Sequence, residues 1–407
     1  MTPSSRLPLI FIVATVTLDA IGIGLIFPVL PRLIEEVTGR PISEAALWGG
    51  ILTSSFAAMQ FLFGPPLGAL SDRYGRRPVL LVSLAVMALS YLAMALATTI
   101  WVLLATRIFA GITSATQSTA TAFIADITPP ADRGRRFGLI GAGFGAGFVL
   151  GPVIGGLLAE VHLHAPFYAA AALALTNLIL GLVVLPETLA SENRRPFSLA
   201  ASNPFTAIWT AIRLPDLRRV LLCFFVLAVA MNVYPTIWAF FGPVAFGWST
   251  TMVGLSLTLY GIFFALGQAL LVGRLIKRLG EHRAALFAMI ANAVTLAAIG
   301  LATSGVFVLM VTPFTALGGA ATPALQAIAS RTTPPDAQGQ LQGVLSSINS
   351  VAMIISPLIM TQVFHLFTGP AAPVLAPGAP FVLAALLMVV CVALHVAGSR
   401  ALKSAAP

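Results

Sequence analysis

The sequence has little charge and almost no cysteine. Of its 407 residues only 9% are charged, whereas 58% are hydrophobic. A soluble domain carries about 25% charged residues, so this composition excludes a soluble globular protein. Cys223 and Cys391 both lie in apolar runs without a C-x-x-C neighbour, which leaves no basis for a metal site or a disulfide. The alternating ten-residue segments of membrane β-barrels are lacking as well. The composition therefore predicts an all-α membrane protein.

Apolar runs of about 20 residues recur along the chain, and each is long enough to cross a bilayer as a helix. The first run has no A-x-A-like site after it and contains Asp19, so we expect an uncleaved helix rather than a signal peptide. Twelve transmembrane helices are expected, at 7–30, 47–70, 79–98, 100–127, 137–159, 166–186, 218–241, 251–272, 284–303, 306–330, 341–366 and 379–399.

The distribution of basic residues predicts the orientation. The net charge of +9 does not indicate nucleic-acid binding, because the basic residues lie in short loops between apolar runs. Nineteen of the 22 fall at the termini and in loops on one side of the membrane, whereas only Arg32 and Arg40 fall on the other. Because positive loops stay inside, both termini and the central linker are expected in the cytoplasm.

Two polar loops repeat at one offset. The pattern Gly68-x-Leu70-x-x-Arg73-x-Gly75 returns 205 residues later as Gly273-x-Leu275-x-x-Arg278-x-Gly280. A Thr-Pro-Pro-x-x-x-Gly-x-x-x-Gly pattern at 128–138 returns at 333–343, which is the same offset. A shared offset implies a duplicated six-helix unit. We therefore expect an N-terminal half at 1–186, a cytoplasmic linker at 187–217 and a C-terminal half at 218–407, with a substrate site between the halves at mid-depth.

Three stretches carry a resemblance to the major facilitator superfamily. They are the loop at 68–78, Arg107 in the fourth span, and a glycine-rich run in the fifth with Gly143, Gly147, Gly151-Pro152 and Gly155. The glycine-proline run resembles the motif of the drug:proton antiporters. More narrowly, Leu18–Pro31, Gly68–Ser83 and Pro323–Gln326 resemble the tetracycline efflux proteins. The resemblance implies a transporter that exchanges a small amphipathic solute for protons, and no cofactor or metal.

Asp19 and Arg107 are the charged residues that the proton-coupling hypothesis rests on. Asp19 lies about halfway along the first span, where an ionised carboxylate costs several kcal/mol unless it is paired or faces water. A protonated Asp19 bound to a neighbouring helix is the alternative to a proton-handling site. Arg107 either extends to the membrane surface or pairs with a carboxylate in the cavity. The resemblance favours roles in proton transfer for both.

Amides and aromatics inside the spans are the candidates for binding the solute. Such amides more often join helices than bind ligands. Gln60, Gln117 and Gln326 are nevertheless expected to face the cavity, together with Phe264 and Asn292. A pocket for amphipathic solutes is mostly apolar with few polar groups, which a set of this kind can form.

The candidate gating residues lie in the loop at 68–78 and in the fifth span. Asp126 is expected to reach Arg73 or Arg136 in a cytoplasmic charge network, or else to form a solvated surface pair worth about 0–1 kcal/mol. The residue 205 positions after Asp72 is Lys277, so the second copy of the loop lacks this carboxylate. Asp72 is therefore expected to act on a helix N-terminus of the other half. Arg77, in the same loop, is a further gating candidate. The glycines at 143, 147, 151 and 155 predict close approach to a helix of the other half, and Gly151 and Pro152 are the gating candidates of this span.

The resemblance to tetracycline efflux proteins fails at three charged positions. Their third-span Asp, eighth-span His and ninth-span Asp fall here on Ser90, Phe264 and Asn292. We therefore expect a neutral C-terminal wall beside an N-terminal coupling set. A transporter of a neutral metabolite such as a sugar stays open as an alternative. A receptor is disfavoured by the short loops, and an enzyme by the lack of a nucleophile–base pair. The chain is expected to function as a monomer.

Overall fold

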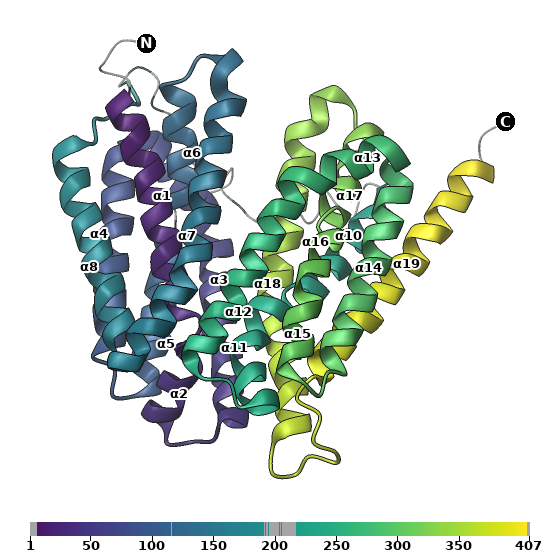
Figure 1. The fold of residues 1–407 in the computed structure, drawn as a ribbon. Helices are drawn as coiled ribbons and strands as arrows, with labels where there is room; N and C mark the ends of the chain where they lie inside the picture. Colours follow the sequence, from purple (N-terminus) through teal and green to yellow (C-terminus); the bar gives the residue numbers. More distant parts are fainter. Residues whose placement is uncertain are drawn as a thin grey trace. The chain divides into compact units, whose positions relative to one another are not determined.

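The computed structural model describes residues 6–190 except 115, the single residues 192, 194, 203 and 205, and residues 217–404. Every regular element in these ranges is helical (Figure 1). Eleven of the described helical segments are long and apolar enough to cross a membrane, and Ile100–Ile112 is a shorter apolar helix. This confirms the predicted all-α membrane fold. Most of the predicted linker at 187–217 lies outside the described residues.

The chain packs as two units that each include a segment from the other half of the sequence. The first consists of Met1–Arg40, Ser55–Asn203 and Ser249–Thr258, and the second of Pro41–Ser54, Pro204–Trp248 and Leu259–Pro407. Helices α3 and α12 therefore run through both. The two predicted halves, 1–186 and 218–407, were drawn from the sequence repeat and not from packing. Their boundaries stay a prediction.

The first unit is built around α1, which lies along α7 and α8. Figure 1 shows α1 running beside α7. Its core includes Phe11, Ile12, Leu80, Leu84 and Phe123, all at most 7% exposed. Its helices are α1 (Arg6–Ile26), α2 (Leu30–Thr38), most of α3 (Ile42–Tyr74), α4 (Arg76–Ala95), α5 (Ile100–Ile112), α6 (Thr116–Asp126), the 3₁₀ turn η2 (Pro130–Asp132), α7 (Arg133–Val161), α8 (Ala165–Val184) and the first residues of α12 (Thr250–Leu266).

The second unit has a core rich in aromatic rings. Trp238, Phe241 and Phe381 are at most 2% exposed, and both Trp238 and Phe241 pack against Phe381. Its helices are α10 (Arg218–Met231), α11 (Val233–Phe246), the π-helical turn η4 (Gly267–Val272), α13 (Gly273–Leu279), α14 (Glu281–Gly300), α15 (Gly305–Val311), η5 (Thr312–Phe314), α16 (Thr315–Gly318), α17 (Ala321–Thr332), η6 (Pro335–Ala337), α18 (Gln338–Thr368) and α19 (Ala379–Ser404).

The structure reproduces the 205-residue repeat in its element boundaries. The starts of α14, α15, α17, η6 and α18 each lie 205 residues after those of α4, α5, α6, η2 and α7. Gly75 and Gly280 precede the equivalent helices α4 and α14 with φ of 112° and 75°. Residues with a Cβ rarely adopt such angles, which explains the glycine at both positions. The duplicated unit inferred from two loops thus extends over the helices between them.

Two spans of the second unit are discontinuous at mid-length. The segment Arg218–Phe246 breaks at Asn232, between α10 and α11. Pro235 explains this break, because it has no N–H to donate to the carbonyl of Met231. The segment Gly305–Thr332 passes through η5 and α16, and then breaks again at Gly319 and Ala320 before α17 begins. In the first unit, the fourth predicted span is likewise divided into α5 and α6.

Candidate functional site

Asp19 is buried in the interior of the first unit. It lies in α1 with only 8% of its surface exposed, and Thr116 at the start of α6 lies beside its carboxyl group. Thr116 stands where the fourth span resumes after its break, and its buried hydroxyl group has no hydrogen-bond partner among the described residues. No ion pair of Asp19 is found among the described residues. The structure therefore confines this carboxyl group within an apolar span without a cationic partner in contact.

Tyr91 connects Asp19 with Arg107. Its phenol group interacts electrostatically with both charged side chains. The ring lies against Gly22, where a Cβ would come within 3.1 Å of the Tyr91 Oη. Gly22 lies three residues after Asp19, on the same face of α1. The sequence analysis did not select Tyr91, although its position next to Ser90 in the third span marked it as a polar aromatic residue inside an apolar helix.

Arg107 is held within α5 by weak contacts. One Nη2 hydrogen bond goes to the sulfur of Met94, which lies three residues after Tyr91 in α4. The buried Nε has no hydrogen-bond partner within the described part of the chain. A guanidinium group normally forms several charge-assisted hydrogen bonds, which are absent in this environment. Arg107 is thus free to take a carboxylate or another anion as its partner.

Four of the five candidate solute-binding side chains can be placed, and they fall into two groups. Gln60 donates to the hydroxyl of Ser114 at 2.8 Å, inside the break between α5 and α6. The backbone of Gln117 lies in α6, but its side chain is outside the described part of the structure. In the second unit, Phe264 is 38% exposed and stacks on Tyr260 with ring centroids 5.9 Å apart.

Asn292 and Gln326 complete the set in the second unit. Asn292 is 1% exposed and donates from Nδ2 to the Gly318 carbonyl at 3.2 Å, while its buried Oδ1 has no partner among the described residues. It therefore joins α14 to the irregular end of α16. Gln326 is half-buried in α17, one turn after Thr322. The structure thus brings Gln60 to the fourth-span break and Gln326 to the other unit's broken helix.

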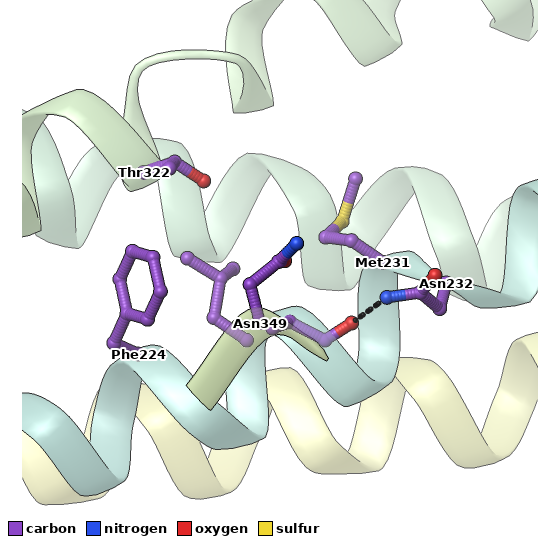
Figure 2. Close-up of a pocket in the computed structure, with 7 residues that line it drawn as sticks. Phe224, Met231, Asn232, Thr322 and Asn349 are labelled. Atoms are coloured by element: carbon purple, nitrogen blue, oxygen red, sulfur yellow. Dashed lines mark hydrogen bonds between the residues drawn. The ribbon is translucent and has the colours of Figure 1, made fainter. Parts of the chain in front are cut away.

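A small cavity opens beside the two breaks of the second unit. Its volume is about 160 Å³, and Figure 2 shows Thr322, Asn349, Met231 and Phe224 arranged around it. Leu227, Ala228 and Asn232 complete the lining. The lining includes no Asp, Glu, Lys, Arg or His. Its hydrogen-bonding side chains are two amides and one hydroxyl, which suit a neutral polar group.

The loop at 68–78 forms a charge network within the first unit. Arg76 contacts Asp72 and donates from Nε to Asp126 at 3.3 Å. Asp126 thus pairs with Arg76 rather than with Arg73 or Arg136, the expected partners. Arg136 instead donates to the backbone of Ile127 and the hydroxyl of Thr128.

The other two basic residues of the loop point elsewhere. Arg73 lies over the ring of Tyr74 at 5.2 Å, and Arg77 donates to the Leu182 carbonyl at 2.7 Å.

Glu187 also belongs to this network, and the sequence analysis missed it. Its two carboxylate oxygens accept the backbone N–H groups of Arg76 at 2.9 Å and Arg77 at 3.1 Å, which are the first residues of α4. The first N–H groups of a helix lack internal partners, and an anion there also complements the helix dipole. The adjacent Thr188 hydroxyl donates to Asp126. The chain leaving α8 is therefore bound to the loop between α3 and α4.

The glycine stripe of α7 packs against α1. A Cβ at Gly147, Gly151 or Gly155 would come within 3 Å of the α1 backbone, and one at Gly143 would meet Thr17 as closely. The expected partner, a helix of the C-terminal half, was therefore wrong for this stripe. The reason is that α1 and α7 belong to one repeat and cross closely along their lengths.

The adjacent face of α7, with Pro152 and Gly156, contacts the start of α12. A Cβ at Gly254 would come within 3 Å of the Pro152 carbonyl, and the Gly156 carbonyl accepts a hydrogen bond from Thr251 at 3.1 Å. Thr251 also donates to Glu160 at 2.7 Å. These residues of α12 belong to the same packing unit as α7. Pro152 and Gly156 therefore do meet a helix from the C-terminal half of the sequence.

No group of three or more His, Cys, Asp or Glu side chains that could hold a metal ion occurs in the described part of the chain. Cys223 and Cys391 are buried free thiols, with each sulfur directed at the backbone carbonyl of the other residue.

Comparison with known proteins identifies the family. The profile of the Major Facilitator Superfamily matches residues 12–244 and 220–407. Tetracycline resistance protein, class C, of Escherichia coli is 45% identical over 356 residues, covering 88% of this chain and 89% of that protein. Multidrug resistance protein 2 of Bacillus subtilis (strain 168) is 29% identical over 362 residues, covering 88% of each.

A solved structure agrees with the sequence matches. The crystal structure of the human organic anion transporter MFSD10 (TETRAN) aligns with a TM-score of 0.70 at 25% identity, covering 97% of this chain and 100% of that one. The family profile accounts for nearly the whole sequence, and the all-helical fold is shared with a solved transporter. The chain is a member of the Major Facilitator Superfamily.

Proposed function

We propose that this protein is a proton-coupled antiporter that exports amphipathic drugs across the bacterial inner membrane as a monomer, with both termini in the cytoplasm. The observation that carries the proposal is the arrangement of Asp19 and Arg107. Both lie inside apolar spans of one unit, both interact with Tyr91, and neither forms an ion pair with the other. Relatives named for tetracycline and multidrug resistance support drugs as the solutes, and the superfamily consists of transporters rather than enzymes.

The coupling follows from competition at Asp19. A carboxyl group in this interior is more easily held in its neutral form, so it takes up a proton from the periplasm when the site opens outward. Drug binding favours the deprotonated form of Asp19, so the proton is released. The Asp19 carboxylate then attracts Arg107, whose Nε has no partner among the described residues. Proton uptake and drug binding are therefore mutually exclusive, which is the requirement for antiport.

Solute binding and gating are assigned to the other candidate residues. Gln60, Gln117, Gln326, Phe264 and Asn292 supply the sparse polar and aromatic groups that an amphipathic solute needs. Rocking of the two halves gives alternating access. The gating residues are Asp72, Arg73, Arg77 and Asp126 on the cytoplasmic side, and Gly151 and Pro152 in α7.

Expression in an efflux-deficient bacterium tests the proposal. We expect raised resistance to several amphipathic drugs, tetracycline among them, and loss of that resistance with an uncoupler that collapses the proton gradient. Unchanged drug susceptibility together with accumulation of a labelled sugar would instead support the second candidate, a transporter of a neutral metabolite. The neutral lining of the second unit's cavity is the observation that keeps this alternative open.

A further inference from the structure

The cavity of the second unit lies where two spans lose their helical hydrogen bonds. Asn232 is at the midpoint of the span Arg218–Phe246, and Thr322 is the second residue of α17, just after the break at Gly319 and Ala320. Non-helical backbone at membrane depth is tolerated only where it is buried in protein or lines a water-filled cavity. Both breaks border the cavity of about 160 Å³. Transporters build substrate sites at mid-depth from broken helices of this kind.

The polar groups of the cavity are left with unused hydrogen-bonding capacity. Asn232 donates from Nδ2 to the Ala228 carbonyl at 2.8 Å, as Figure 2 shows, and this leaves its Oδ1 free to accept. The Nδ2 of Asn349 contacts the Met353 sulfur at 3.6 Å, a weak acceptor. The Thr322 hydroxyl forms no hydrogen bond with any described residue. The cavity thus presents two amide oxygens, one hydroxyl group and one amide N–H group to a ligand.

The size and neutrality of the cavity restrict what it accepts. A volume of about 160 Å³ equals about five water molecules at about 30 Å³ each, which suits one functional group of a drug rather than the whole molecule. No ionisable side chain lines the cavity, so a charged group would find no counter-ion there. Phe224, Leu227 and Met231 provide apolar contacts on the remaining walls. A compact, neutral group that both donates and accepts hydrogen bonds fits these conditions.

The repeat relates this cavity to the Asp19 site. The span formed by α10 and α11 is the first of its half, as α1 is in the other, and α17 lies 205 residues after α6. Thr322 is the repeat counterpart of Gln117, which adjoins Thr116 beside Asp19. The equivalent place is therefore ionisable in one half and neutral in the other. The first copy has a group that can bind a proton, and the second has a cavity lined by neutral polar groups.

We propose that Asn232, Thr322 and Asn349 form a subsite that binds a neutral carboxamide-type group of the exported solute. The amide oxygens of Asn232 and Asn349 accept from the N–H groups of the carboxamide, and the Thr322 hydroxyl donates to its carbonyl oxygen. This inference rests on the proposed drug export and adds the chemical class of the group that is recognised.

The test measures equilibrium binding to the purified full-length protein in detergent, without a proton gradient. The probes are tetracycline, which carries a carboxamide, and its nitrile analogue, in which that group is dehydrated. The variants are Thr322→Val and Asn349→Ala, with Thr322→Ser as the conservative variant that retains the hydroxyl. Ser350→Ala is the control, because Ser350 bonds to the Ser346 carbonyl of its own helix and does not line the cavity.

We expect the wild-type protein to bind tetracycline about tenfold more tightly than the nitrile, the usual scale for one lost hydrogen-bond partner. Thr322→Val should weaken tetracycline binding by about tenfold. Asn349→Ala should weaken tetracycline binding by about tenfold and leave nitrile binding unchanged, because the nitrile has no N–H group to donate. Thr322→Ser and Ser350→Ala should match the wild type. Equal losses for both compounds in Asn349→Ala, or no loss of tetracycline binding in either Thr322→Val or Asn349→Ala, would overturn the subsite and leave drug export standing. A wild-type protein that binds neither compound would overturn the proposed function, and the subsite with it.

Discussion

The two repeat copies hold the same ion pair with its charges exchanged. In the first copy Arg76, at the start of α4, pairs with Asp126 at the end of α6. In the second copy Glu281, at the start of α14, pairs with Arg331 in the last turn of α17 at 2.9 Å. Both residues of the second pair lie 205 positions after those of the first. The bond between these helix ends has thus been kept while its polarity has been inverted.

The surroundings of the two pairs differ more than the pairs themselves. Arg76 is 13% exposed and also contacts Ser71 and Asp72, whereas Arg331 is 79% exposed. An exposed pair contributes about 0–1 kcal/mol, while an arginine with several charged partners is harder to replace. The comparison teaches that the first loop is an interdependent network, whereas the second pair is a single contact between an exposed Arg331 and a Glu281 that is 15% exposed.

The interiors of the two copies show a parallel difference. Arg107 has Thr312 as its repeat counterpart, and Thr312 is a buried residue whose hydroxyl donates to the Val308 carbonyl of its own helix. The half that carries the charge network of the loop at 68–78 therefore also carries the charge inside the apolar spans. In the other half the matching position is neutral and satisfied locally. We assign proton coupling to the first half for this reason.

The largest effect is expected from removing the charge of Arg107. Arg107→Gln should lower proton-driven drug transport by about 100-fold, the scale lost when a group that acts in proton transfer is removed. The matched change at the repeat counterpart, Thr312→Val, should leave the coupling intact. Transport into inverted vesicles under an imposed pH gradient measures both. Equal losses in the two variants would break the assignment of coupling to one half.

Exchanging the charges of the Arg76–Asp126 pair should have an intermediate effect. Arg76→Glu with Asp126→Arg gives the first copy the polarity of the second, but the carboxylate introduced at position 76 then faces Asp72. We expect a loss of stability of about 1–3 kcal/mol, because charged hydrogen-bonding partners are left unpaired. The same exchange in the second copy, Glu281→Arg with Arg331→Glu, should cost less than about 1 kcal/mol. Thermal unfolding in detergent compares the two.

Adding a third substitution, at Asp72, tests whether this residue is the reason that the two copies differ in stability. Adding Asp72→Lys to the exchanged first copy reproduces the second copy, which has Lys277 at that position. We expect this triple variant to recover most of the lost stability, since the repulsion at position 76 is removed. If the triple variant is no more stable than the double variant, Asp72 is not the reason for the difference between the copies.

The smallest effect is expected at the start of α4. Glu187→Gln keeps the hydrogen-bonding oxygen and removes the negative charge that faces the Arg76 and Arg77 N–H groups. A loss of about 0.3–1 kcal/mol of stability follows from the weakened interaction with the helix dipole. Glu192→Gln, an exposed change further along the chain, serves as the control. Identical unfolding midpoints for the two variants would show that the carboxylate charge does not stabilise this helix end.

The fold was predictable because hydropathy and repetition act over long stretches. Span positions follow from apolar runs, and the offset of 205 residues was visible in two loops before any helix end was known. The inverted pair was not visible, because a comparison of residue identities treats Arg76 and Glu281 as unrelated. Only the geometry shows that they make the same contact with opposite signs.

The site was predictable by residue type but not by partner. Asp19 and Arg107 stand out because charge inside an apolar run is costly. Tyr91 does not stand out in the same way, because it carries no charge, and its importance depends on electrostatic interactions with residues of two other spans. The prediction that Asp126 pairs with Arg73 or Arg136 was wrong for a related reason. Arg73, Arg76 and Arg136 are all basic residues of neighbouring loops, and only the geometry shows that Arg76 is the one that contacts Asp126.

Drug-driven proton release tests the central claim most directly. Purified protein in a weakly buffered solution with a pH indicator is mixed with tetracycline, and the protons released are counted for the wild type and for Asp19→Asn. Our account predicts release by the wild type and none by the variant, which should keep the unfolding midpoint of a folded protein. Unchanged proton release by the folded Asp19→Asn variant would contradict the account, because the proton displaced by the drug would then come from another group.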